Sequence, residues 1–259
     1  MAEQKPLIVL AGGPQHNQAI TELLGDTYRV SRYDDKTGYV SRLIDEHAAM
    51  VIVTATEDDA WRFWTTTPKS SPATRRIAML LISERSADHE LALRSGADLV
   101  MYPDEIAGQL ARTVKDHARV PDPAYVEQLD CDCEGSLPEL AQQGVEQFNS
   151  GEYYKQHDLF EALWVETDSS VRDLYRAVLQ VGVAYYQIER RNYRGALKML
   201  QRSVQWLTIL PDSCQGIDVA QLRRDSYRVR AELERLGESG IDQFDNSLLQ
   251  PVKMVEKSS

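Results

Sequence analysis

Long apolar runs are missing from this chain of 259 residues. No uninterrupted apolar stretch approaches the roughly 20 residues that a membrane-spanning helix needs, so we expect no membrane association. The apolar run at residues 7–10 is too short for the core of a signal peptide. Hydrophobic residues (42%) and charged residues (27%) occur in the proportions of a globular protein. We therefore expect a folded, cytoplasmic protein.

Cysteine is also scarce, with Cys131, Cys133 and Cys214 as the three examples. Three cysteines at these positions are too few and too unevenly placed for a disulfide framework. Cys131 and Cys133 look like half of a zinc site, but no second pair of ligands follows at a zinc-finger spacing. We favour two thiols in a linker, with no metal and no cofactor, over a zinc site.

Positive charge is in deficit, with 29 Lys and Arg against 40 Asp and Glu and a net charge of −11. Binding to phosphate backbones depends on clustered Lys and Arg, so nucleic acid is a disfavoured partner. Interleaved Arg and Tyr at residues 185–194 can stack on single-stranded bases, which leaves RNA binding as an alternative. We favour a solvated helix end whose cations complement the helix dipole.

The first 119 residues alternate short apolar segments with amphipathic ones. Such alternation predicts a parallel sheet covered by helices on both faces. The expected strands lie at residues 7–10, 28–33, 50–53, 77–82 and 99–101. In such sheets ligands bind at the carboxyl ends of the strands, where this chain places Ala11, Gly12, Thr54, Ser83 and Tyr102.

This order of segments resembles the receiver domain of bacterial response regulators. Ser83 after the fourth strand, the triplet at residues 96–98 and Pro103 after the fifth carry the resemblance. It implies an α/β, flavodoxin-like, five-stranded parallel sheet, and a role in signalling.

The resemblance also implies residues that this chain lacks. A working receiver has acidic residues after its first strand to hold magnesium, an aspartate after the third to accept phosphate, and a lysine before the proline. Here Ala11, Gly12, Thr54 and Tyr102 stand at those places. We therefore expect a receiver-like domain that is not phosphorylated on aspartate. The glycines at 12 and 13 leave nucleotide binding as an alternative, but no third glycine and no P-loop lysine accompany them.

The remaining chain divides into a linker, a helical domain and a tail. Prolines, acids and Gly-Ser interrupt any period at residues 120–137, which favours a solvated connector with a short turn. Residues 138–237 have helical periodicity throughout and predict an all-α bundle, and residues 238–259 form a tail of low periodicity. An echo at an offset near 39 residues suggests helical hairpins of the tetratricopeptide type as an alternative.

Polar residues recur on two of these helices. His157 and Glu161 share a helix face, and Asp158 and Trp164 lie beside it. On the next helix three polar residues follow at intervals of four: Arg172, Arg176 and Gln180. If the stripes meet, Glu161 pairs with Arg176, and the remaining polar groups complete a hydrogen-bonded network.

Three interpretations of this cluster stay open. We favour an internal network that fixes helix register. An anion or small-ligand pocket with Arg172 or Arg176 as its clamp is the second. A catalytic or metal site is the third, and it lacks the third ligand that a catalytic zinc site has.

Several of the same residues carry a second resemblance. Phe148-Asn149, Gly151, Tyr153, His157-Asp158, Glu161, Trp164, Gln180, Asn192 and Gly195-Ala196 are similar to domain-of-unknown-function family 309, a small all-helical bacterial domain. The similarity covers about residues 137–210. It implies the helical fold and transfers no activity.

These patterns favour a non-catalytic regulatory or adaptor protein over an enzyme. The receiver-like domain would dock to a partner or to a second copy of the chain, and the helical domain would supply a protein- or ligand-binding surface. The alternative is an enzyme or small-ligand sensor with its site at His157, Glu161 and Arg176.

Overall fold

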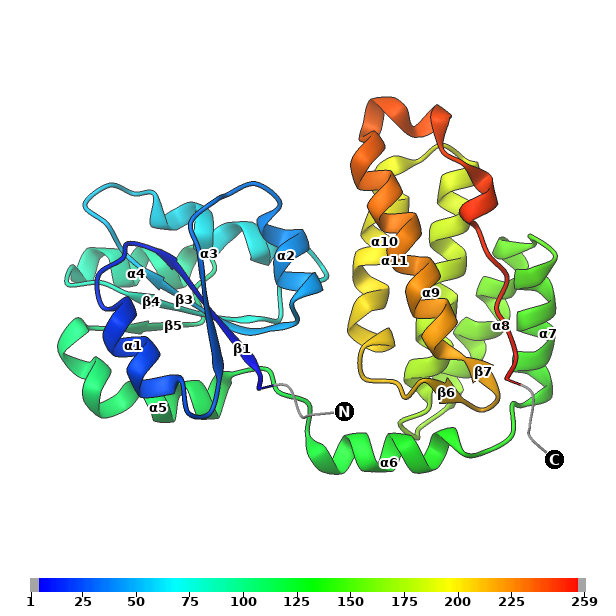
Figure 1. Ribbon diagram of the computed structural model, residues 1–259, viewed down its shortest axis with the longest axis horizontal. Coiled ribbons are helices and arrows are strands. Elements are labelled where there is room, and N and C mark those ends of the chain that lie inside the picture. The colour runs from blue at the N-terminus through cyan, green and yellow to red at the C-terminus, as the bar shows by residue number, and fades with distance from the viewer. Residues whose placement is uncertain (1–4, 256–259) are drawn as a thin grey trace. The chain divides into compact units, whose positions relative to one another are not determined.

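The computed structural model describes residues 5–255 and divides the chain into two units at Val120 and Pro121 (Figure 1). Residues 1–4 and 256–259, at the outer ends of the expected first domain and tail, lie outside the described part. In the described part, no helix is long and apolar enough to cross a membrane.

The first unit is a five-stranded parallel sheet covered by helices. Its strands run in the order β2-β1-β3-β4-β5, which is the flavodoxin-like order, and this confirms the predicted sheet. Its elements are β1 (Leu7–Gly12), α1 (Asn17–Leu24), β2 (Arg29–Tyr33), α2 (Tyr39–Asp45), β3 (Ala48–Thr54), α3 (Trp61–Ser70), β4 (Ala78–Ile82), α4 (Ser86–Ser95), β5 (Leu99–Met101), a 3-10 turn (Pro103–Glu105) and α5 (Ile106–His117).

Alternate residues of each strand face opposite layers of helices, as a period of two requires. On β1, Leu7 and Val9 join the core beneath α2 and α3, which includes Trp61. Ile8 and Leu10 join the core beneath α1 and α5. Because both faces are covered, β3 is buried at every position, and its apolar sequence follows from that.

The second unit is mainly helical and is built around α9 (Figure 1). Helices α8 and α10 pack along α9, so most of its side chains are buried. The elements are α6 (Pro123–Cys133), α7 (Glu139–Asn149), α8 (Tyr153–Glu166), α9 (Arg172–Glu189), α10 (Tyr193–Leu207), β6 (Ser213–Cys214), β7 (Ile217–Asp218), α11 (Val219–Leu236) and two 3-10 segments, Glu238–Gln243 and Asn246–Leu248.

The segment expected to be a solvated linker contains helix α6. The Asp122 side chain accepts a hydrogen bond from the Ala124 N–H, and Pro123 occupies the first turn, so the helix begins at a well-formed cap. Leu129 and Cys133 are buried in the core of the second unit. Pro123, one of the prolines that suggested a connector, therefore marks the start of α6.

A disulfide between Cys133 and Cys214 corrects the expectation of free thiols. The two residues are 81 positions apart and meet because the strand pair β6–β7 packs against the end of α6. Cys131, two residues earlier, is free and exposed. The pairing depends on tertiary packing, which cysteine count and spacing do not reveal.

Candidate functional site

The loop after β1 lies directly on the end of β3. The Gly13 N–H donates a hydrogen bond of 2.8 Å to the carbonyl oxygen of Thr54. Gly12 has a φ of +81°, and a Cβ atom at Gly12 would lie 2.3 Å from the same oxygen. The Thr54 hydroxyl donates to the Gln15 carbonyl at 3.4 Å, and Thr54 is 4% exposed. The backbone of the loop after β1 therefore covers the carboxyl end of β3.

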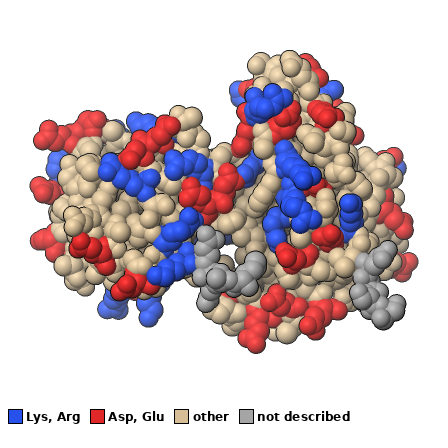
Figure 2. Space-filling view, in the orientation of Figure 1, with Lys and Arg blue, Asp and Glu red and all other residues tan. Residues whose placement is uncertain are grey.

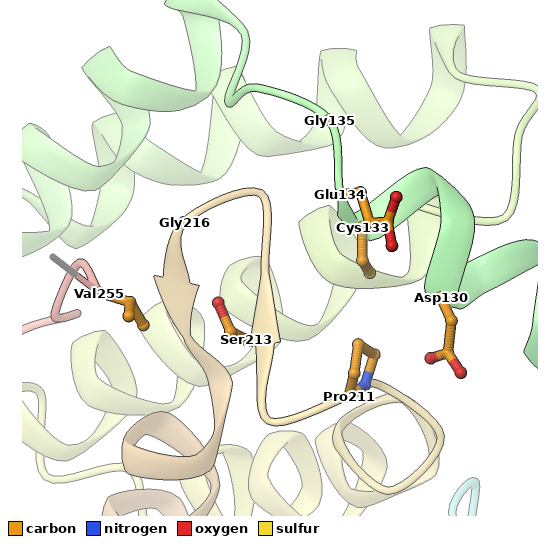
Figure 3. A pocket seen from close by; sticks show the side chains of 8 residues that line it. All are labelled: Asp130, Cys133, Glu134, Gly135, Pro211, Ser213, Gly216 and Val255. Atoms are coloured by element: carbon orange, nitrogen blue, oxygen red, sulfur yellow. The ribbon is translucent and has the colours of Figure 1, made fainter. Parts of the chain in front are cut away.

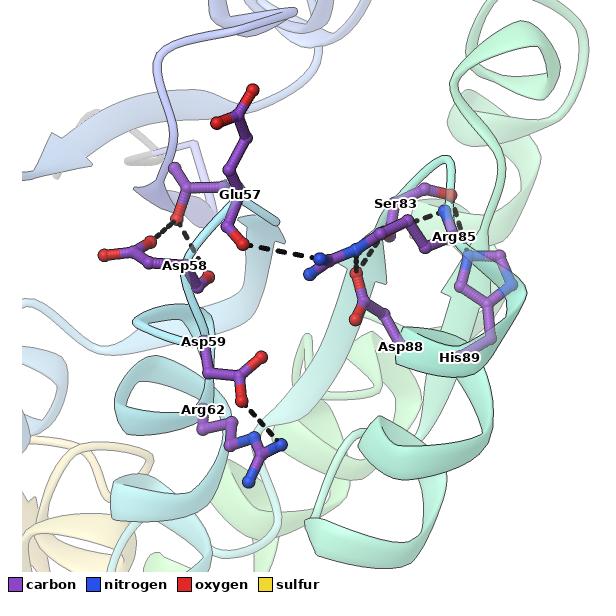
Figure 4. A network of polar contacts seen from close by, with 9 residues as sticks. Glu57, Asp58, Asp59, Arg62, Ser83, Arg85, Asp88 and His89 are labelled. Carbon is purple, nitrogen blue, oxygen red and sulfur yellow. Dashed lines mark hydrogen bonds and ion pairs between the residues drawn. The ribbon is translucent and has the colours of Figure 1, made fainter.

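The end of β4 is occupied by a network of side chains (Figure 4). The Ser83 hydroxyl donates to Asp88 Oδ2 at 2.6 Å, and Arg85 Nε donates to the same oxygen at 2.8 Å. His89 Nε2 lies 2.9 Å from the Ser83 carbonyl oxygen, and the His89 ring lies 4.3 Å from that of Tyr102. The polar groups here satisfy one another.

Three acidic residues follow β3, but they face different partners (Figure 4). The Thr56 hydroxyl donates to the Asp58 carboxylate and lowers the pKa of that group. Asp59 forms an ion pair of 2.7 Å with Arg62, and the Glu57 carbonyl accepts from Arg85 at 3.3 Å. Among residues 5–255, no three His, Cys, Asp or Glu side chains are placed to hold one metal ion.

On α8, His157, Asp158 and Glu161 line the outer face of the second unit. His157 Nδ1 lies 3.1 Å from Asp158 Oδ1, and the two side chains are 33% and 66% exposed. Glu161 is exposed, whereas Arg176, its expected partner, lies against the rings of two tryptophans. Asp158 and Glu161 are therefore solvated, and His157 is half-buried beside them.

Arg176 instead stacks on two indole rings. Its guanidinium carbon lies 4.6 Å from the ring centroid of Trp164 on α8 and 4.0 Å from that of Trp206 on α10. Cation–π contact of this kind is favourable and prefers tryptophan. The structure therefore brings together Trp164 and Arg176 of the predicted cluster, and adds Trp206, which sequence analysis missed.

Asp173, three residues before Arg176 on α9, makes a hydrogen bond with another helix. The Tyr125 hydroxyl of α6 donates to Asp173 Oδ2 at 2.6 Å. Burial raises the pKa of Asp173, although Tyr125 and the charges of Arg176 and Arg172 act in the opposite direction. Sequence analysis missed Asp173 and Tyr125. Asp173 lies next to Arg172 in the chain, so the polar stripe could have included it.

Gln180, the last residue of the predicted stripe, is buried one turn beyond Arg176. It is 4% exposed, and its Oε1 atom has no hydrogen-bond partner in the described structure. Gln156 on α8 is fully buried and packs against Gly182, where an added Cβ would lie 2.3 Å from Gln156 Nε2. The two glutamines are core residues of the α8–α9 packing.

Two adjoining hollows flank the disulfide and the strand pair β6–β7. The first, of about 440 Å³, is open to solvent and has the carboxylates of Asp130 and Glu134 at its edge (Figure 3). The second, of about 430 Å³, is lined mainly by apolar atoms, including those of Leu137 and Val145. Gly216 and Val255 border both hollows, so the two hollows are neighbours.

The comparison with protein families concerns the helical unit. The family described as "Domain of unknown function (DUF309)" matches residues 141–199, which lie within the stretch expected to resemble it. An "Uncharacterized protein" of Aquifex aeolicus (strain VF5) is 20% identical over 86 residues. That alignment spans 33% of this chain and 26% of the relative. The similarity therefore concerns one part of each protein.

Proposed function

We propose that this chain is a non-catalytic regulatory or adaptor protein. Its α/β unit would act as a docking unit without phosphorylation, and its helical unit would supply a second binding surface. The observation that carries the proposal is the contact between Gly13 and Thr54, which places backbone over the end of β3.

The carboxyl edge of the sheet argues against phosphoryl transfer. Phosphoryl transfer needs an exposed nucleophile and a cation that offsets the charge of the phosphate. The Thr54 hydroxyl is buried and bonded to the Gln15 carbonyl, while the Ser83 hydroxyl is bonded to Asp88. Both hydroxyls are therefore engaged within the protein. An edge whose hydroxyls are engaged in this way suits recognition of a partner whose binding does not depend on a phosphorylation state.

The geometry of the helical unit favours binding over catalysis. Asp158 and Glu161 are exposed and His157 is half-buried on α8, while the Arg176 guanidinium lies against Trp164 and Trp206. An enzyme needs acid, base and charge-stabilising groups that converge on one substrate position. These groups do not converge, so a small-ligand sensor or enzyme at this cluster is the weaker proposal.

The test is to incubate the full chain with acetyl phosphate and Mg²⁺ and to measure its intact mass. We expect no addition of a phosphoryl group, whereas a receiver domain with an intact acidic site, treated in parallel, gains one. A phosphorylated product would contradict the proposal. A melting temperature raised by a small anion in the wild type and not in Arg176→Lys would favour the sensor instead.

A further inference from the structure

Residues 253–255 pair with β7 and the turn that precedes it. The Val255 N–H donates to the Gly216 carbonyl at 2.7 Å, and the Asp218 N–H donates to the Lys253 carbonyl at 2.9 Å. Ile217 and Met254 form an antiparallel bridge between these bonds. The segment therefore pairs with the edge of the two-stranded sheet through one antiparallel bridge and its two flanking hydrogen bonds.

One side chain of α7 extends this pairing. Asn149 Nδ2 donates to the Val252 carbonyl at 2.9 Å, and the Val252 N–H donates to Asn149 Oδ1 at 2.8 Å. An amide that satisfies both backbone groups of one residue imitates a neighbouring strand. The Val252 side chain is 3% exposed and serves as the apolar anchor.

The other side chains of the segment contribute little to its attachment. Met254 and Val255 are 49% and 43% exposed, and Lys253 is exposed as well. Backbone hydrogen bonds and one buried anchor thus hold residues 252–255. Strand addition to a sheet edge works in this way, because the backbone supplies affinity and a pocket for one side chain supplies specificity.

The surroundings of the segment have a definite chemistry. Asp130 and Glu134 border the first hollow (Figure 3), and Glu146 borders the second. Asp and Glu also gather over α6 in the space-filling view (Figure 2). Negative charge around an edge that takes an extended backbone favours a peptide that carries a lysine.

We propose that this edge is a docking site for an extended peptide segment of a partner protein, with an apolar residue followed by a lysine. Residues 252–255 occupy the site in cis, and the partner segment displaces them. The groups that receive the partner are those that hold the chain's own segment: the Asn149 amide, the Gly216 carbonyl and the Asp218 N–H. The inference assigns a site and a class of partner to the helical unit, and it rests on the binding role proposed above.

The test uses the fluorescently labelled, end-blocked peptide Gln-Pro-Val-Lys-Met-Val and the full chain. Val252→Asp places a charge in the buried anchor position and releases the chain's own segment. We expect this variant to bind the peptide at least about tenfold more tightly than the wild type, measured by fluorescence anisotropy, because the competing segment has left. Val165→Asp, the same change at an exposed position of α8, is the matched control and binds as the wild type does.

Two further variants define the contact. Asn149→Ala combined with Val252→Asp loses the gain in affinity, because the amide that pairs with the anchor residue is absent. A peptide with aspartate in place of its first valine does not bind. Equal affinity of Val252→Asp and the wild type for the unmodified peptide would overturn the proposal.

A measurement on the wild type covers the case in which Val252→Asp does not fold. A peptide with a photoreactive phenylalanine in place of methionine, in excess over the full chain, is expected to crosslink to residues 213–218. Crosslinks confined to other residues would overturn the proposal. A wild-type dimer that Val252→Asp abolishes would overturn it in favour of exchange between copies. The phosphorylation test concerns the α/β unit, so failure of either proposal is recognised separately.

Discussion

The guanidinium carbon of Arg176 lies 4.0 Å from the ring centroid of Trp206 and so links α9 to α10. Trp164 of α8 takes part in the same stack at 4.6 Å, so three helices meet at one cation. Register between helices that share an apolar core is weakly specified by packing alone. A charge that must stack on two rings specifies it more narrowly.

Arg176→Lys should destabilise the second unit. A lysine keeps the charge but loses the planar group that stacks on the rings, so we expect the free energy of unfolding to fall by about 1–2 kcal/mol. Urea unfolding followed by tryptophan fluorescence measures this directly. The control is Glu161→Gln on the exposed face of α8, which should stay within about 0.5 kcal/mol of the wild type. Equal losses in the two variants would restore the Glu161–Arg176 network that the sequence suggested.

Gly12→Ala should destabilise the first unit. The new Cβ atom would lie 2.3 Å from the Thr54 carbonyl oxygen, and the φ of +81° strains any other residue. We expect a loss of about 1–3 kcal/mol in the free energy of unfolding from the backbone strain, and more from the clash. Gly108→Ala in α5, where nothing lies within 4 Å of the added Cβ, should instead stabilise the protein by about 0.5–1 kcal/mol. A neutral Gly12→Ala would show that the loop does not press on β3.

Asp173 predicts a pH dependence of stability. Burial raises its pKa in the folded state above the ordinary value of about 3.9. Below that ordinary value both states bind the proton. As the pH rises through the raised pKa, the unfolded chain has released its proton while the folded chain still holds one, so stability is lost.

Comparison with Asp173→Asn isolates this contribution. The variant stays neutral at every pH, so the wild type should lose stability relative to it between pH 3 and pH 7, a range chosen around the ordinary pKa of about 3.9. Urea titrations at a series of pH values measure the difference. The raised pKa would be refuted if the difference in stability between the wild type and Asp173→Asn did not change with pH. A difference that shifted in favour of the wild type as the pH rose would refute it as well.

The disulfide predicts sensitivity to reductants. Cys133 and Cys214 close a stretch of 81 positions, and loss of such a bond costs about 2–5 kcal/mol. Cys133→Ser should therefore lower the free energy of unfolding and abolish its response to dithiothreitol, whereas Cys131→Ser should change neither. Equal stability with and without reductant would count against the bond. Because disulfides are rare in cytosolic proteins, the cytoplasmic location expected from the sequence stays a prediction.

The sheet could be predicted because period and turn signals are local. Four of the five strands are apolar runs and β2 alternates, and β3 has no polar residue before Thr54, so its burial on both faces follows from the sequence. Helices α7 to α11 are similarly marked by their apolar stripes. Helix α6 was hidden because its acidic, proline-led sequence looks like a connector, and its cap and two buried residues become visible only in the fold.

The candidate site was only partly predictable. Helical spacing placed Trp164 and Arg176 on stripes, but it does not fix how far each helix is rotated toward its neighbours. That rotation turns Glu161 to solvent and brings Trp206, from a third helix, onto Arg176. The pairing of Cys133 with Cys214 and of Asn149 with Val252 joins residues 81 and 103 positions apart, which no local pattern reveals.

Amide hydrogen exchange at Gly13 tests the central claim most directly, because this N–H is the one that donates to the Thr54 carbonyl. The measurement is made on the full chain with Mg²⁺ alone and with Mg²⁺ and acetyl phosphate. An α/β unit that works without phosphorylation keeps the same protection of Gly13 in both. Loss of protection on addition of acetyl phosphate would show that the loop leaves Thr54, and would contradict the account.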